Sequence, residues 1–372
     1  MNRLRLFERL LSVRDRLLAS RDFQRFALRF GPTRAIARHR ARELFDLCAG
    51  FVYSQVLFAC VELRLFERLR GGPKTVHSLA HASGLPPEAM RTLLTAAAAL
   101  RLVQWRGQER CGLGPHGATL LGNPALLPLI AHHALLYQDL ADPCALLRGE
   151  CRPSRLSAFW SYARSADPRA LPADGVRPYT SLMSASQELL GSDILTAYSL
   201  TSHKCLLDVG GGDGAFALMA AEDARELRVV CFDLPAVTEF TRERFARSRC
   251  ADRLSVAAGD FLSDPLPRGA DVISLIRVLH DHDDDAARKI LLAVRTALPP
   301  GGTLLIAEPL SGTPGAERVG DAYFGLYLLA MGSGKPRTVA QLSQLIVAAG
   351  FAAPRPLPTR MPMNTEVLVA RG

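Results

Sequence analysis

The sequence is poor in aromatic residues, which fill only 7% of its 372 positions, and none of its eight cysteines forms a Cys-x-x-Cys pair. Most of the cysteines lie inside apolar runs, where a free thiol packs like a small hydrophobic side chain. The pattern disfavours a disulfide framework and a zinc site, and it is typical of a reducing compartment. We find no window of about 18 uncharged apolar residues, so we expect no membrane-spanning helix. The arginine-rich N-terminus lacks a plain apolar run after it, which argues against a secretory signal.

The positive charge of the chain is concentrated at one end. Residues 1–45 hold twelve arginines and four acids, a balance of +8, which leaves +1 of the total of +9 for all the remaining residues. Within them, residues 4–30 carry apolar side chains at helical spacing, with arginines between them. We interpret residues 1–40 as a basic amphipathic arm. It is either a helix that contacts an acidic surface, such as lipid headgroups, nucleic acid or a partner, or a solvated helix face.

Residues 41–123 have the element order of a winged helix. Gly31-Pro32 is expected to end the helix of the arm. The helices expected after it are Arg42–Leu69, Thr75–Ala82 and Glu88–Leu100, followed by strands at 102–105 and 109–113. A DNA-reading module would crowd its second helix with basic or amide side chains, yet this helix has only Arg91 before Arg101. We therefore expect no nucleic-acid binding and favour a dimerisation or substrate-covering module.

The pattern changes again towards the C-terminus. Residues 124–200 are expected to be a helical linker and substrate-covering region, with a loop over 164–178 and a helix over Tyr179–Ser199. From residue 201 to residue 372, strands alternate with helices, which indicates an α/β domain with a largely parallel sheet covered on both faces. The expected strands are Cys205–Val209, Arg228–Phe232, Leu254–Ala257, Asp271–Leu275, Thr303–Ala307 and Glu366–Val369, and the expected helices are Phe216–Arg225, Pro235–Arg247, Asp284–Leu298 and Val339–Ala349.

Three polar motifs follow successive strands of this sheet. The first is a glycine-rich turn after Asp208 that includes Gly210 and Gly212, where a ligand can approach the backbone and a helix N-terminus. The second is Asp233-Leu234, an acid placed to bind ribose hydroxyls, and the third is Asp260-Phe261, which can hold an adenine amino group and its ring. All three lie at carboxyl ends of strands, where open α/β sheets bind their ligands.

The glycine-rich turn favours one cofactor over its main rival. It reads Gly210-Gly211-Gly212-Asp213-Gly214 and departs from the Gly-x-Gly-x-x-Gly pattern of NAD-binding turns. An acid in the turn would repel a pyrophosphate, whereas Asp213 can face the ammonium group of a methionine moiety. The residues therefore favour S-adenosylmethionine.

With these motifs, the chain resembles the S-adenosylmethionine-dependent O-methyltransferases of the caffeate and acetylserotonin type. Its matching pieces also include Leu279-His280-Asp281 and Ala307-Glu308-Pro309, in the same order along the chain. The resemblance implies a C-terminal Rossmann-like methyltransferase sheet and an N-terminal all-helical winged-helix domain that forms a homodimer. Residues 42–55 and 330–337 resemble more narrowly the bacterial carotenoid branch, the hydroxyneurosporene and demethylspheroidene O-methyltransferases.

The resemblance also assigns catalytic roles. His280 is implied as the general base, and a neutral imidazole suits that task near neutral pH. Glu308 is implied to orient the imidazole, and Arg277, on the same rim, is a candidate cofactor contact. The plant enzymes have a second orienting acid in a Gly-Lys-Glu-Arg-Thr stretch, where this chain has Pro336. Asp283, Asp284 and Asp285 precede a helix and suit its N-terminus, so we expect no metal site.

The acceptor is expected to be a small apolar molecule. Tyr323, Phe324, Tyr327 and Met331 form an apolar helical face, which is either core or, as the resemblance implies, the wall of the acceptor pocket. The leading hypothesis is methylation of a hydroxyl on an acyclic carotenoid, by a cytoplasmic protein whose arm can lie against the inner or photosynthetic membrane. Two alternatives stay open: C-methylation of a bacteriochlorophyll precursor, and a winged-helix regulator that only senses a ligand.

Overall fold

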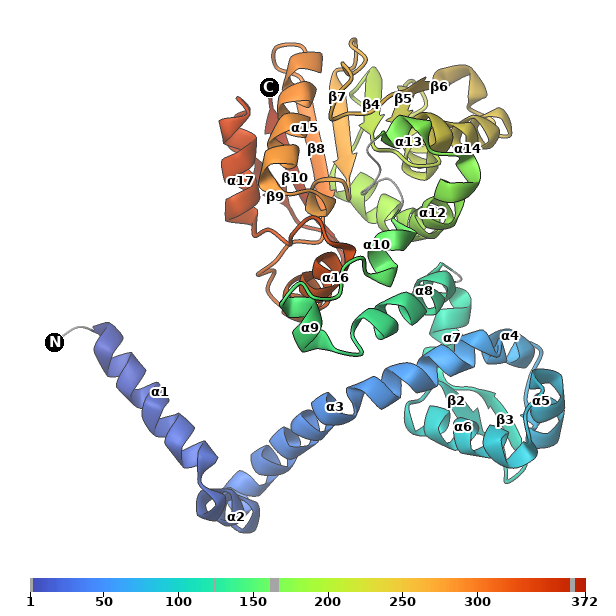
Figure 1. Ribbon diagram of the computed structural model, residues 1–372, viewed down its shortest axis with the longest axis vertical. Coiled ribbons are helices and arrows are strands. Elements are labelled where there is room, and N and C mark those ends of the chain that lie inside the picture. Colours follow the sequence, from blue (N-terminus) through green and yellow to red (C-terminus); the bar gives the residue numbers. More distant parts are fainter. Residues whose placement is uncertain (1–2, 124, 161–166, 362–364) are drawn as a thin grey trace. The chain divides into compact units, whose positions relative to one another are not determined.

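The computed structural model describes residues 3–123, 125–160, 167–361 and 365–372. The chain divides into two compact units, Met1–Leu121 and Gly122–Gly372. The first is mostly helical, and the second is built around a seven-stranded sheet (Figure 1).

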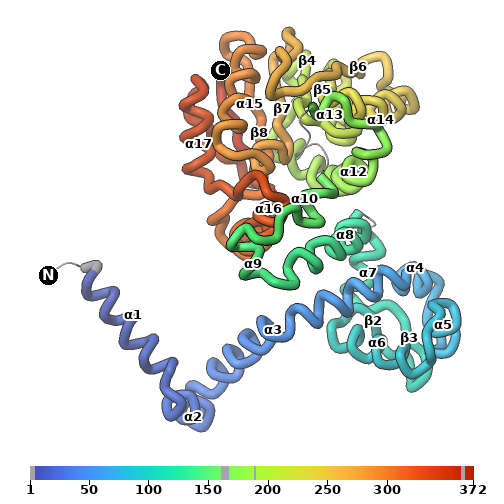
Figure 2. Tube along the Cα trace, viewed as in Figure 1, coloured from blue at the N-terminus to red at the C-terminus, as the bar shows by residue number. Residues whose placement is uncertain are grey.

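The first unit begins with three consecutive helices, α1 (Arg3–Ala19), α2 (Arg21–Arg29) and α3 (Gly31–Glu62), and the chain bends between them (Figure 2). The bends fall at Ser20 and Phe30, whose backbone is extended. The expected helix break at Gly31-Pro32 is confirmed, because α2 ends at Arg29 and α3 starts at Gly31. Proline is compatible with the first turn of a helix, where the backbone amide has no partner within the helix.

The rest of this unit is a winged helix. Its helices are α4 (Leu65–Leu69), α5 (Val76–Ser83), α6 (Pro87–Ala99) and α7 (Pro115–Gly122), the last of which reaches the boundary between the units. An antiparallel sheet in the order β1-β3-β2 completes it, with β1 at Lys74–Thr75, β2 at Val103–Trp105 and β3 at Arg110–Leu113. The strands expected at 102–105 and 109–113 are confirmed as β2 and β3, whereas β1 was not expected, because its two residues are too few to show a periodic pattern.

The sheet of the second unit has the order β6-β5-β4-β7-β8-β10-β9. The strands from β6 to β8 run parallel, and β10 is antiparallel to both β8 and β9. Their bounds are β4 Cys205–Val209, β5 Arg228–Asp233, β6 Leu254–Ala258, β7 Val272–Ile276, β8 Thr303–Glu308, β9 Arg355–Leu357 and β10 Glu366–Arg371. The expected strands are confirmed to within two residues, and β9, a three-residue edge strand that contains a proline, was missed.

Helices cover both faces of this sheet (Figure 1). One face packs on α15 (Asp284–Ala297) and α17 (Val339–Ala348), and the other packs on α12 (Ala173–Ala197), α13 (Ala215–Asp223) and α14 (Pro235–Ala246). The strands β4, β7 and β8 are buried throughout, so the ends of the central strands are rigidly placed. The motifs at their carboxyl ends therefore share one edge of the sheet.

A smaller helical layer completes the second unit. It consists of α8 (Leu126–Asp139), α9 (Pro143–Leu147), α10 (Arg155–Phe159) and α16 (Phe324–Met331), with shorter turns at η1 (Pro168–Ala170), η2 (Ala251–Arg253), η3 (Leu279–Asp281) and η4 (Arg318–Tyr323). The expected loop over 164–178 is partly wrong, since α12 begins at Ala173 and continues through Pro178. Residues 161–166 lie outside the described residues.

Candidate active site

The glycine-rich turn joins β4 to α13 over a buried acid. Asp208 Oδ1 accepts a hydrogen bond of 2.6 Å from the Ser274 hydroxyl. Its Oδ2 is buried and has no hydrogen-bond partner in the described part of the chain. Burial raises the pKa of this carboxyl to about 7, against the opposing effect of the Ser274 bond. An unpaired buried oxygen of this kind calls for a ligand or water as partner.

Asp233 holds the turn from the neighbouring strand. Its Oδ2 accepts from the Gly212 amide at 2.8 Å and its Oδ1 accepts from the Leu234 amide at 2.7 Å. Burial raises the pKa of Asp233 to about 6, although both amide bonds favour the charged form. Each carboxylate oxygen can accept a further bond, so ribose hydroxyls could be held here as well. Gly212 has a left-handed backbone, at φ +61°, which suits glycine.

A cavity of about 320 Å³ opens beside these residues. Its wall includes the other sequence-predicted residues Gly210, Leu234, Asp260, Phe261 and Arg277, together with Asp213 and Asp281. The structure thus brings the three motifs to one site. The volume lies within the range of small-ligand pockets. The several carboxylates on its wall suit a ligand that carries positive charge.

Two of these wall residues also have local structural partners. Asp260 Oδ1 accepts from the Leu262 amide at 2.9 Å, so this acid also caps its own turn. Arg277 has a left-handed backbone at φ +57°, which costs an L residue about 1–2 kcal/mol. Its Nη1 donates to the Ser186 hydroxyl at 2.8 Å. Strain of this kind at the edge of a cavity is common in functional sites.

Asp213 does not have the role that we expected for it opposite a ligand's ammonium group. Its Oδ2 pairs with Arg244 Nη2 at 2.5 Å, so the carboxylate in the turn is already neutralised by α14. It does not present a free charge to a ligand's ammonium group. Asp208 Oδ2, at the start of this turn, is the carboxylate oxygen without a hydrogen-bond partner in the described part of the chain.

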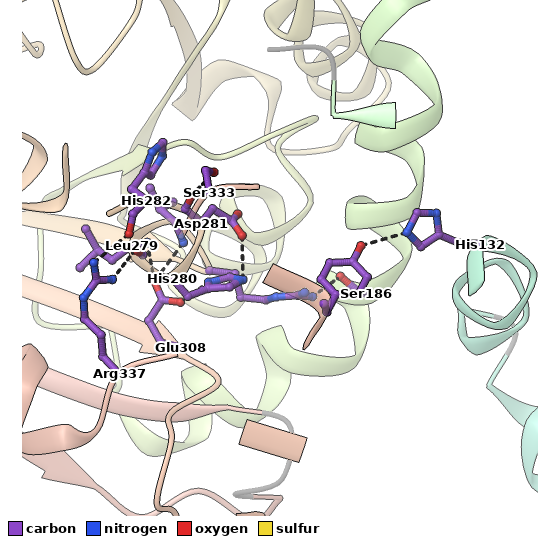
Figure 3. A network of polar contacts seen from close by, with 12 residues as sticks. His132, Ser186, Leu279, His280, Asp281, His282, Glu308, Ser333 and Arg337 are labelled. Carbon is purple, nitrogen blue, oxygen red and sulfur yellow. Dashed lines mark hydrogen bonds and ion pairs between the residues drawn. The ribbon is translucent and has the colours of Figure 1, made fainter. Parts of the chain in front are cut away.

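His280 lies in η3, just beyond β7, between two carboxyl groups (Figure 3). Its Nδ1 is 2.5 Å from Glu308 Oε2, and its Nε2 is 3.1 Å from Asp281 Oδ1. Glu308 Oε1 also accepts from the amides of Val278 at 3.0 Å and Leu279 at 2.7 Å. Glu308, only 1% exposed, therefore fixes both the ring and the turn that carries it.

Asp281 is a member of this site that sequence reasoning missed. Burial raises the pKa of its carboxyl to about 7, although nearby His280 opposes this. Burial alone lowers the pKa of His280, but Asp281 and Glu308 outweigh it and hold that pKa above its ordinary value. The titrations of His280 and Asp281 are therefore coupled to each other. Asp281 stands in the sequence motif Leu279-His280-Asp281 without an assigned role, and only Asp283, Asp284 and Asp285 were expected at the start of α15. That start is confirmed at Asp283, whose side chain caps the helix.

The aromatic face of η4 and α16 packs against α8. Tyr327 hydroxyl is 2.9 Å from His132 Nε2, and Tyr323 hydroxyl is 2.8 Å from His133 Nε2. Phe324 meets the His280 ring edge-on, with the centroids 5.8 Å apart. Met331 is buried in the same apolar cluster. Burial lowers the pKa of His132 to about 4, so this imidazole is neutral at physiological pH. Neither histidine was predicted, since only the fold brings α8 to α16.

Comparisons with known proteins identify the family. A family model of the O-methyltransferase domain matches residues 137–352, and a model of the O-methyltransferase dimerisation domain matches residues 45–123. The chain belongs to the S-adenosylmethionine-dependent O-methyltransferases. S-adenosylmethionine is accordingly the cofactor of this enzyme, and the acid-lined cavity fits a cationic ligand.

Several relatives match nearly the whole chain. The chain is 41% identical over 355 residues to the demethylspheroidene O-methyltransferase of Cereibacter sphaeroides, covering 95% of this chain and 93% of that protein. It is 35% identical to the acetylserotonin O-methyltransferase of Mus musculus, covering 89% and 88%. Among solved structures, human N-acetylserotonin methyltransferase in complex with its methyl donor matches with a TM-score of 0.76 at 26% identity, covering 89% and 97%.

The dimerisation match includes most of α3, whose apolar side chains are exposed. Leu44, Phe45, Leu47 and Phe51 are each more than 60% exposed. By length and composition, α3 could also cross a membrane, and it is the one unbroken helix of the described residues that passes this test. Length and composition alone do not show a membrane span, so the expectation of none stays a prediction. The sequence has no run of about 18 uncharged apolar residues here because the apolar stretch of α3 contains Asp46.

Among the residues that the structure describes, no group of three or more histidine, cysteine, aspartate and glutamate side chains is arranged to hold a metal ion.

Proposed function

We propose that His280 is the general base of this O-methyltransferase. The observation that carries the proposal is the bond from Nδ1 to Glu308, which fixes the tautomer with its proton on Nδ1 and leaves the Nε2 lone pair available. Nε2 takes the proton of an acceptor hydroxyl, whose oxygen then becomes a stronger nucleophile. The bound cofactor supplies an electrophilic methyl group on a sulfonium. Asp281, beside Nε2, stabilises the imidazolium that forms.

The cofactor is held, in this proposal, by the residues of the cavity wall. The backbone at Gly210 and Gly212 faces its methionine part, and Asp208 lies behind this turn, away from the cavity wall. Asp233 accepts bonds from the ribose, Leu234 contacts the sugar and base, and Asp260 with Phe261 receives the adenine. Arg277 closes the rim next to His280. These assignments follow from the order of the motifs along the sheet edge.

The acceptor we propose is an acyclic carotenoid with a hydroxyl at C1. Relatives at 41% and 39% identity are named demethylspheroidene O-methyltransferases. The wall beside His280 consists of aromatic rings, with Tyr323 and Tyr327 stacked at 5.6 Å between centroids. Rings of this kind pack well against an extended polyene. Burial lowers the pKa of both His132 and His133, so these imidazoles add no charge that would oppose an apolar acceptor.

A methyl-transfer assay tests both proposals. Wild-type protein, His280→Ala and the exposed control His81→Ala would receive labelled S-adenosylmethionine with a 1-hydroxylated carotenoid, and in parallel with a bacteriochlorophyllide. We expect label in a carotenoid methyl ether with wild type and His81→Ala, and a loss of about 10²–10⁴-fold in kcat with His280→Ala. Label in the chlorin ring would replace the proposed acceptor. Full activity of His280→Ala would remove the proposed base.

We also propose that the arm binds an anionic membrane surface, where an apolar acceptor would reside. Residues 1–45 carry a net charge of +8. On α1, the large side chains Phe7 and Leu10 are 60% and 62% exposed, beside arginines. Apolar and basic side chains on one exposed helix favour the interface of anionic lipids. The enzyme would then be a cytoplasmic protein held on the inner or photosynthetic membrane.

Vesicle flotation with the full chain tests this contact. We expect binding to vesicles that contain phosphatidylglycerol, weaker binding to phosphatidylcholine, and release at high salt. Leu10→Glu should weaken binding, whereas Leu147→Glu, at a residue with a similar exposure of 64%, should not. Equal binding of both variants and wild type, or none by any, would refute a role for the arm at lipid.

A further inference from the structure

The turn that carries His280 is held by one loop on its outer side. The loop is Ser333–Arg337, which directly follows α16 and its C-terminal Gly332. Four successive backbone carbonyls, those of residues 279 to 282, each accept a hydrogen bond from this loop. The donors are Arg337 Nη1 to Leu279 at 2.7 Å, the Lys335 amide to His280 at 3.0 Å, the Ser333 hydroxyl to Asp281 at 2.7 Å, and Arg337 Nη2 to His282 at 2.7 Å.

Arg337 is the central member of this set. It is only 2% exposed, and its Nε donates to Asp284 Oδ1 at 2.9 Å, so its charge is paired. The guanidinium bonds to carbonyls on both sides of His280, and its planar fork holds them at a fixed spacing. Figure 3 shows Arg337 approaching the turn from the side opposite to Asp281. A buried arginine that donates to backbone carbonyls determines the position of a loop more than it stabilises the fold.

The packing of the loop is tight at one residue. Gly334 has a left-handed backbone, at φ +78°, and a β-carbon there would lie 2.2 Å from the carbonyl oxygen of His280. The loop backbone thus approaches the catalytic turn as closely as the chain allows. Since α16 carries the aromatic wall beside His280, the same loop also links that wall to the base.

We propose that the Ser333–Arg337 loop positions His280 for proton transfer, with Arg337 as the principal positioning residue. The proposal rests on the proposed role of His280 as base. It explains how the site works with Pro336 where the resemblance implies a second orienting acid. The turn is fixed by Glu308 from inside, through two amides and the ring, and by Arg337 from outside, through two carbonyls. Without the outer bonds, the ring can move away from the two carboxyl groups.

The test compares Arg337→Lys with the exposed Arg288→Lys control on α15. A lysine cannot reach both carbonyls, so we expect kcat for the hydroxylated carotenoid to fall about 10²-fold, as for an atom displaced by about 1 Å. The dissociation constant for S-adenosylhomocysteine should stay within about twofold. Ser333→Ala removes one neutral bond and should lower kcat by about 2–10-fold. It also serves as the test if Arg337→Lys does not fold.

A second readout does not require the acceptor. The pKa of His280 can be followed by NMR of histidine-labelled protein, assigned with His280→Gln. The charged and titratable groups around this ring are Asp281, Glu308, Arg277 and His282. If the loop positions the ring against its carboxyl groups, that pKa should fall towards the ordinary value in Arg337→Lys and stay unchanged in Arg288→Lys.

The outcomes separate the two proposals. A shifted His280 pKa in Arg337→Lys, without transfer to the carotenoid by wild type, would support the positioning role and refute the acceptor. Wild-type kcat and an unchanged His280 pKa in both Arg337→Lys and Ser333→Ala would overturn the positioning role. Activity in His280→Ala would overturn it as well, because no base would then be positioned.

Discussion

The substitution Glu308→Gln tests how the histidine tautomer is set. Glu308 Oε1 accepts from two backbone amides, and its Oε2 faces Nδ1 of His280 at 2.5 Å. In the variant, the amide oxygen can keep both backbone bonds, which places the NH₂ group against Nδ1. Two donors cannot share that bond, so Nδ1 becomes the acceptor and the ring proton moves to Nε2.

The expected size of the effect follows from this tautomer. A ring protonated at Nε2 has no lone pair for the acceptor hydroxyl, so the general-base contribution of about 10²–10⁴ in kcat is lost. The two retained amide bonds should keep the turn in place. We expect the free energy of unfolding to fall by no more than about 1–3 kcal/mol, the range for one hydrogen bond to a charged group. Cofactor affinity should be unchanged, because Glu308 is not on the cavity wall.

The assay combines steady-state methyl transfer, thermal unfolding and titration with S-adenosylhomocysteine. Glu317→Gln is the matched control, since it makes the same change at an exposed residue. A kcat for Glu308→Gln within about threefold of wild type, with intact folding, would refute the argument that Glu308 sets the tautomer. A proportional loss of cofactor binding would show instead that the variant disturbs the sheet edge.

Four further predictions concern other parts of the chain. The rate should rise with pH through the pKa of His280, which lies above its ordinary value. Asp281→Asn removes a neighbouring anion, so a pH–rate profile of this variant should show the rise at lower pH. Asp233→Asn should weaken S-adenosylhomocysteine binding in calorimetry by about 1.5–3 kcal/mol, since a charged acceptor of two amides is lost. Gly214→Ala should lower the melting temperature, because the backbone there has φ +80° and a β-carbon would lie 2.6 Å from the ring of Phe245. Phe51→Glu should yield monomers in light scattering, since this ring is 72% exposed on the dimerisation helix.

Most of the catalytic fold could be predicted from local patterns. The strands β4, β5 and β8 contain apolar runs of three or four residues, each followed by an acid, and such runs are typical of a buried parallel strand. The edge strand β9 could not be predicted, because its three residues include a proline and carry no period. The beginning of α12 was missed because Pro178 argues for a loop, yet the long helix tolerates it through its packing on α13 and α14.

The site was predictable where each residue acts from its own strand end, and unpredictable where distant segments meet. His280 and Glu308 follow β7 and end β8, which are neighbours in the sheet. In contrast, Arg337 donates a hydrogen bond to the carbonyl of Leu279, which is 58 residues away in the sequence. The expected contact of Asp213 with a ligand's ammonium group was wrong for the same reason, since its partner Arg244 lies 31 residues away on α14. Charge in a sequence indicates a ligand only when no distant residue neutralises it.

Helix α3 shows how structure and family together decide a question that hydropathy leaves open. An apolar helix of 32 residues can be a core helix, a membrane span or an interface. The helix is not a core helix of this chain, because Cys60 is the only buried residue among those described in it. The dimerisation model begins at residue 45 and includes the exposed side chains Phe45, Leu47 and Phe51. The match to a dimerisation domain therefore favours an interface with a second copy over a membrane span for the apolar half of α3.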